Sequence, residues 1–75
     1  MKYQIFLPFS EDQEKLTAQI FIEGQCWAEI IPEYEALEIK FYPRPDGEPW
    51  QIDSSTAVKA IGEAELRLIG QLNDN

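Results

Sequence analysis

The sequence predicts a two-layer α+β domain, in which one C-terminal helix covers an antiparallel sheet of four to five strands. Short segments rich in β-branched and aromatic residues follow one another along most of the chain. Their connections are too short for the crossovers that parallel strands need. A single stretch with helical spacing comes last, and one helix can cover one apolar sheet face. A length of 75 residues predicts a single domain over residues 1–75.

The first expected strand covers residues 2–9, where Pro8 stops the strand because proline cannot donate a ladder hydrogen bond. Residues 10–15 are the most polar stretch of the chain. Ser10 followed by Gln13 resembles a capping box, which predicts one or two helical turns. A polar loop is the alternative for this stretch.

A hairpin is expected next, with residues 17–23 as its first strand and residues 25–31 as its second. Glu23 and Gly24 form the tight connection, because glycine readily takes the positive φ that such turns use. Pro32 ends the second strand.

Apolar and polar residues alternate most cleanly in residues 36–42, which predicts a strand with two different faces. One face holds Leu37, Ile39 and Phe41, and the other holds Glu38, Lys40 and Tyr42. Residues 43–47 contain two prolines and an Asp-Gly pair, which predicts a turn. Residues 48–52 are expected to add a short final strand at the sheet edge, where Pro49 is tolerated.

The helix is expected to start at an N-cap chosen from Asp53, Ser54 and Ser55 and to run to about residue 72. Apolar residues at helical spacing predict its buried stripe. The residues of this stripe are Ala57, Ile61, Ala64, Leu68 and Leu72.

Charge restricts the classes of partner. Fourteen acidic and six basic residues give a net charge of -8. Nucleic acids and anionic membranes are disfavoured, because both require a positive protein surface. A protein partner with a basic surface is favoured, since opposite fields steer the encounter. The alternative is that the acids merely keep a small domain soluble.

Residue types also restrict the chemistry. The chain has no histidine and one cysteine, Cys26, which excludes the Ser-His, Cys-His and His-metal arrangements. The glycines are scattered, so no phosphate-binding loop is present. We therefore expect no enzyme activity, no cofactor and no metal. The densest group of carboxylates is Glu29, Glu33, Glu35 and Glu38. Such a group could serve acid–base chemistry or calcium binding, but we favour the alternative, which is a solvated turn.

The sequence predicts a cytoplasmic protein. A single cysteine cannot form an internal disulfide, and no apolar run is long enough to span a membrane. The first residues lack the long apolar block of a secretory signal.

Seven residues are candidates for binding a protein partner: Tyr42, Arg44, Trp50, Glu38, Glu65, Leu66 and Ile69. The turn at residues 41–50 combines prolines with aromatic and arginine side chains, which are the types that anchor interfaces. The sheet face that carries Glu38 is polar and aromatic. On the helix, the apolar arc is wider than one sheet face requires. For Phe41 and Trp50 the alternative, which we favour, is a place in the core.

These observations predict a small acidic protein-binding domain without catalytic activity. Its concrete form is an inhibitor of the antitoxin, immunity or phage-encoded type that acts on a basic protein surface. The alternative is a self-associating structural module, a homodimer formed through the helix arc at Leu66 and Ile69. A carboxylate-dependent enzyme is the third hypothesis.

Residues 2–5 and 53–69 resemble antitoxins of the HicB kind. The similarity covers under half of the chain, and the central glycine-bearing loop of those antitoxins is missing here. We transfer no residue role from this resemblance.

Overall fold

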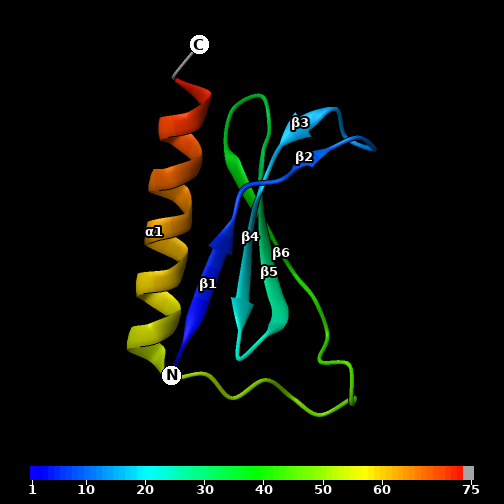
Figure 1. Cartoon of the computed structure of the whole chain (residues 1–75), viewed down its shortest axis with the longest axis vertical. Helices are drawn as coiled ribbons and strands as arrows, with labels where there is room; N and C mark the ends of the chain where they lie inside the picture. The colour runs from blue at the N-terminus through cyan, green and yellow to red at the C-terminus, as the bar shows by residue number, and fades with distance from the viewer. Residues whose placement is uncertain (74–75) are drawn as a thin grey trace.

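The computed structural model describes residues 1–73, which form a sheet layer and a helix layer (Figure 1). Strands β1, β4, β5 and β6 make one antiparallel sheet in the order β1-β4-β5-β6, and β2 and β3 pair as a separate hairpin. The predicted α+β class is therefore confirmed. The elements are β1 (Tyr3–Phe6), β2 (Phe9–Ser10), β3 (Lys15–Leu16), β4 (Ala18–Ile22), β5 (Gln25–Pro32), β6 (Leu37–Phe41) and α1 (Ser54–Leu72).

Three expected strands are present, with shifts of one residue at their ends. Residues 17–23, 25–31 and 36–42 correspond to β4, β5 and β6. The predicted tight connection lies at Glu23 and Gly24, whose φ angles are 50° and 80°. Glycine adopts such an angle without steric penalty, which explains why the chain reverses here.

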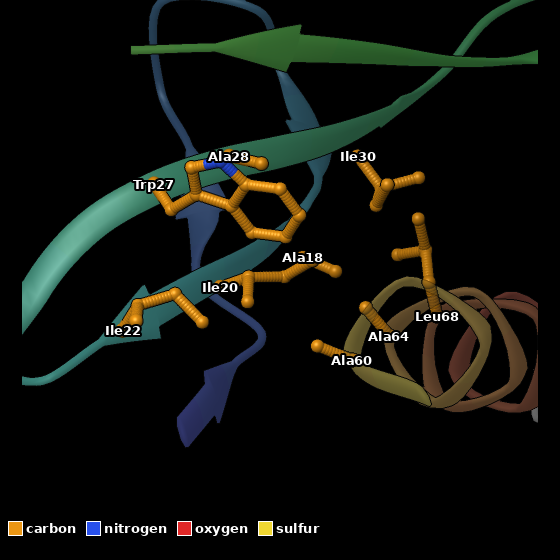
Figure 2. Packing of buried hydrophobic residues seen from close by; sticks show 9 residues of the cluster. All are labelled: Ala18, Ile20, Ile22, Trp27, Ala28, Ile30, Ala60, Ala64 and Leu68. Atoms are coloured by element: carbon orange, nitrogen blue, oxygen red, sulfur yellow. The ribbon is translucent and has the colours of Figure 1, made fainter. Parts of the chain in front are cut away.

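A β-bulge lies close to this turn and sets the direction of an indole. Ile20 of β4 pairs with Ala28 of β5, but the next residue, Phe21, pairs with Cys26. Trp27 is therefore the extra residue on β5. Figure 2 shows its side chain among the apolar residues of the core.

The start of the chain differs from the prediction. The single strand expected over residues 2–9 is divided into β1 and β2, and residues 11–14 form a tight turn between β2 and β3. The Ser10 hydroxyl accepts a hydrogen bond from the Gln13 backbone N–H at 3.3 Å. No helix follows, because the chain takes a φ of 55° at Glu14 and turns back into β3. The loop alternative is therefore correct, and the helical one is wrong.

No strand forms at residues 48–52, so the prediction of a final edge strand is wrong. The chain instead crosses the end of the sheet towards the start of α1 (Figure 1). Trp50 packs against the core, and its Nε1 donates a hydrogen bond to the Tyr42 carbonyl at 2.8 Å. A side chain thus holds this proline-containing segment in place of a strand ladder, and β6 remains the edge of the sheet.

Helix α1 begins as predicted but is rotated relative to the predicted stripe. The Asp53 carboxylate caps its first turn by accepting a hydrogen bond from the Thr56 backbone N–H at 3.1 Å. Of the predicted stripe, Ala64 and Leu68 are buried, Ala57 and Ile61 are partly buried against the core, and only Leu72 is exposed. The buried residues of the helix are Thr56, Ala60, Ala64 and Leu68.

The core lies between α1 and the sheet, where α1 packs over β4 and β1 and side chains of β4 and β5 fill the space (Figure 2). Ala60 and Ala64 are completely buried. Their small side chains let the helix backbone approach the sheet closely, so the helix settles over β4 and β1. The core residues are Ala18, Ile20, Ile22, Trp27, Ala28, Ile30, Ala60, Ala64 and Leu68.

Candidate protein-interaction surfaces

A buried carboxylate organises the sheet face that points away from α1. Glu29 accepts hydrogen bonds from the Thr17 hydroxyl at 2.8 Å and from the Tyr42 hydroxyl at 2.6 Å, one at each oxygen. Both oxygens of this buried group are therefore satisfied. The bond to Glu29 raises the pKa of Tyr42 to about 12. Tyr42, a predicted partner-binding residue, thus has its hydroxyl engaged within the fold.

Cys26 and Lys40 flank this network. Burial and the nearby Glu29 raise the pKa of the Cys26 thiol. The Lys40 Nζ lies 4.9 Å from the centre of the Tyr42 ring, which is a cation–π distance. At neutral pH the thiol and the phenol are both protonated, so neither is an activated nucleophile or a general base.

The predicted residues Arg44 and Trp50 form a closed turn together with Tyr42. The Arg44 guanidinium bonds the Asp46 carboxylate at 2.6 Å and lies 5.9 Å from the centre of the Trp50 ring. The Trp50 indole in turn donates to the Tyr42 carbonyl. Arg44 is half-buried and its charge is neutralised locally. Tyr42, Arg44 and Trp50 are therefore joined by contacts within the turn, although the Arg44 Nε has no hydrogen-bond partner within residues 1–73.

The predicted helix residues lie in the other layer and do not join this turn. Leu66 is 75% exposed, Ile69 is also exposed, and Glu65 is half-buried. Glu38 is exposed on β6, on the sheet face that carries Lys40. The seven predicted residues therefore occupy three separate regions: the closed turn, β6 and the outer side of α1.

The four densest carboxylates do not converge on a cavity. Glu29 is enclosed by its two hydroxyl donors, whereas Glu33, Glu35 and Glu38 are exposed. None of them lines the hollow of about 510 Å³ beside the start of β1 or the smaller hollow of about 180 Å³ next to it. This arrangement provides no pair of carboxylates around a substrate-sized space.

Acidic side chains gather instead at one end of the molecule. The β2–β3 turn, the β5–β6 connection and the end of α1 lie at the same end, which is the upper one in Figure 1. We call the exposed carboxylates of the two turns the acidic pole. Its members are Glu11, Asp12, Glu14, Glu33 and Glu35.

One lysine joins the two turns of the acidic pole. The Lys15 ammonium donates to the Pro32 carbonyl at 3.1 Å and lies 3.4 Å from the Glu33 carboxylate. Neither turn contains a basic residue, and Lys15, the first residue of β3, pairs with Glu33, so the four other carboxylates have no cation within the two turns. The last turn of α1 also carries no basic side chain, although its free carbonyl groups are partially negative.

Two exposed aromatic side chains accompany the acidic pole. Tyr34, at the tip of the β5–β6 connection, is 97% exposed, and Phe9 of β2 is 62% exposed. Sequence reasoning singled out neither residue, and it did not join the 11–14 turn to residues 33–35. The order of the strands could have indicated this proximity. In an antiparallel sheet of consecutive strands, every second connection lies at the same end, and the β1–β4 and β5–β6 connections are such a pair.

The outer edge of β6 is a second unpartnered surface. Leu37, Ile39 and Phe41 share the sheet side that faces the helix layer, as predicted. Phe41 is nevertheless 55% exposed and Ile39 is 37% exposed, so the interpretation of Phe41 as a core residue is wrong. The reason is that α1 packs over β4 and β1 and leaves β6 uncovered. The Phe41 ring contacts only the margin of the core, at Trp27, with ring centres 5.4 Å apart.

Two further findings concern residues 1–73. No helix in this range has the length and apolar character to cross a membrane. Nor do three or more cysteine, aspartate or glutamate side chains come together there as ligands for a metal ion.

No protein-family model, curated protein or solved structure matches the chain.

Proposed function

We propose that this chain is a non-catalytic protein-binding domain whose acidic pole docks on a basic surface of a partner protein. The observation that carries the proposal is the meeting of two turns with five exposed carboxylates and one lysine at one end of the fold. The negative charges of these carboxylates repel one another, and a cationic partner would relieve this repulsion.

The exposed aromatic residues favour a protein over a small cation as the ligand. Tyr34 and Phe9 are almost fully or largely accessible beside the carboxylates. Tyrosine is among the residue types that dominate interface energies, because burying its ring against a partner removes a large apolar area from water. A small hydrated ion buries no such area, so the exposed rings favour a protein ligand.

The concrete form of the proposal is an inhibitor of the antitoxin, immunity or phage-encoded type. Such an inhibitor needs no chemistry of its own, since covering a basic functional surface is sufficient. We place it in the cytoplasm, because its single cysteine, Cys26, is a free thiol. The closed turn of Arg44 and Trp50 belongs to the scaffold in this proposal, and the pole is the contact surface.

The test is capture of a partner followed by binding measurements on the purified pair. We expect the affinity to fall steeply as salt is added, since the attraction is between exposed charges. In the pole variant Glu11→Gln, Glu14→Gln and Glu35→Gln, affinity falls about tenfold or more, mainly through the association rate. Tyr34→Ala should weaken binding by about tenfold, chiefly through the dissociation rate.

The matched control removes three carboxylates elsewhere, with Glu23→Gln, Glu48→Gln and Glu65→Gln. Both triple variants have the same net charge, so only the position of the charges differs. The control should bind within about threefold of the wild type, since charges remote from the contact are screened. Equal losses in the two variants, or an affinity that is indifferent to salt, would contradict the proposal.

A further inference from the structure

The free edge of β6 presents a complete set of backbone groups to solvent. The bonds from Tyr42 N–H to the Trp27 carbonyl and from Glu33 N–H to the Ala36 carbonyl fix which residues of β6 bond to β5. In an antiparallel pair, every second residue of a strand bonds to the neighbouring strand, and the residues between point their N–H and C=O groups away from it. The N–H and C=O groups of Leu37, Ile39 and Phe41 therefore point away from β5. No strand within residues 1–73 pairs with them.

Natural proteins usually protect such an edge, and the protection of β6 is limited to its short length and its two charged residues, Glu38 and Lys40. Strand β6 contains no proline and no bulge. Ile39 and Phe41 expose apolar surface directly beside the free backbone groups. The other edge strand, β1, is different because its residues Tyr3 and Ile5 pack against the core beneath α1.

We propose that a second copy of this chain pairs with β6, strand against strand and antiparallel, with Ile39 on the two-fold axis. Ile39 then faces Ile39 of the second copy, and Leu37 faces Phe41. About six backbone hydrogen bonds form across the axis, and the two sheets become one continuous sheet. The proposal does not depend on the proposed function, because it uses another surface.

The charges of β6 identify the occupant as a second copy. Glu38 and Lys40 flank Ile39 symmetrically on the outer face. About the two-fold axis, each Glu38 lies directly opposite Lys40 of the other copy, where opposite charges stabilise a strand pair. A shift of the register by two residues in either direction places Glu38 opposite Glu38 or Lys40 opposite Lys40. The strand is therefore complementary to itself in one register only.

Two chains of charge -8 repel each other, and the antiparallel arrangement reduces this repulsion. The acidic pole lies at the end of the molecule where β6 begins (Figure 1). Antiparallel pairing places the two poles at opposite ends of the dimer, where solvent and salt screen them from one another. Both poles remain accessible.

Sedimentation velocity over a range of protein concentrations tests the proposal. The wild type should pass from monomer to dimer as concentration rises. Glu38→Lys places lysines opposite each other across the axis and should lower the association constant about tenfold or more. This change also reduces the net negative charge, so general repulsion between chains would predict the opposite result. Adding Lys40→Gln to Glu38→Lys removes the facing cations and should restore association to within about threefold.

Two controls separate this surface from others. Glu48→Lys makes the same change of net charge in the loop before Trp50 and should leave association equal to or stronger than that of the wild type. Leu66→Ser tests the outer side of α1 and should have no effect. Circular dichroism must show that each variant is folded. A chain that is monomeric at every concentration, or dimers sensitive to Leu66→Ser but not to Glu38→Lys, would overturn the proposal.

Discussion

The two halves of the sheet differ in what covers them. Towards β1 and β4, α1 packs on the sheet, and core side chains of β4 and β5 such as Ile20 and Ile30 are almost fully inaccessible. Over β6, the same sheet side carries Ile39 and Phe41 in partial contact with solvent. Both halves have the same alternating pattern in sequence, so the pattern alone does not determine which of them is covered.

The difference arises from the width of a single helix. A helix is about 10–12 Å wide and neighbouring strands lie about 4.8 Å apart, so α1 covers about two strands, β4 and β1, and leaves β6 uncovered. Packing in the covered half stabilises the fold, while the edge of β6 and the acidic pole remain exposed. Substitutions in the two halves should accordingly have different consequences.

The largest expected effect is on stability in the covered half. Ile20→Ala removes a fully buried side chain next to Ala28 and should lower the free energy of unfolding by about 2–5 kcal/mol. The matched change in the uncovered half, Ile39→Ala, should lower it by less than about 1.5 kcal/mol, because that side chain is partly exposed already. Urea denaturation at a concentration where the chain is monomeric measures both. Equal losses would refute the division into two halves.

A smaller effect is expected where the network of Glu29 joins the two halves. Tyr42→Phe removes one of the two donors to a buried carboxylate and should lower the free energy of unfolding by about 1.5–3 kcal/mol. Tyr34→Phe is the matched control, since that side chain is almost fully exposed, and it should change stability little. If Tyr42→Phe is as harmless as Tyr34→Phe, the network does not connect the halves energetically.

The smallest expected effect is the dependence of stability on alkaline pH. The pKa of Tyr42 is about 12 in the folded chain and near its ordinary value of 10.0 when unfolded. Its contribution to stability is therefore complete below pH 10 and is lost as the pH rises from 10 to about 12. Tyr3 adds to this loss, because its bond to Glu63 also raises its pKa.

Thermal unfolding of wild type and Tyr42→Phe at several pH values between neutral and alkaline measures this effect. The difference in stability between the two proteins should shrink above pH 10, since the group that the variant lacks no longer stabilises the wild type. A difference that stays constant up to pH 12 would show that Tyr42 does not titrate in this way.

Local features of the sequence determined the elements with strong patterns. The alternation in residues 36–42 predicted β6, Glu23 and Gly24 predicted the hairpin turn, and Asp53 was among the predicted N-caps. Each of these features acts through neighbours within a few residues, by alternation, by φ preference or by a capping hydrogen bond. They are readable without knowledge of the rest of the chain.

The predictions that failed concern features that depend on residues distant in the sequence. Residues 48–52 have a composition compatible with a strand, but the indole of Trp50 bonds the Tyr42 carbonyl and packs on the core instead. The buried face of α1 includes Ala60, which the predicted stripe omitted, and excludes Leu72, because contact with β4 and β1 selects which apolar residues are covered. The contacts of Trp50 with Tyr42 and Arg44 were likewise not readable from the sequence, because the path of the chain across the end of the sheet brings these residues together.

By itself, the sequence determined the α+β class, most strand positions, the start of the helix and an acidic surface without imidazole. Only the tertiary structure decided which sheet half the helix covers, which turns meet at the acidic pole and which strand keeps a free edge. The physical reason is that secondary structure follows from interactions along the chain. The exposure of a given side chain depends instead on which strands the helix packs over, and this is decided only when the two layers meet.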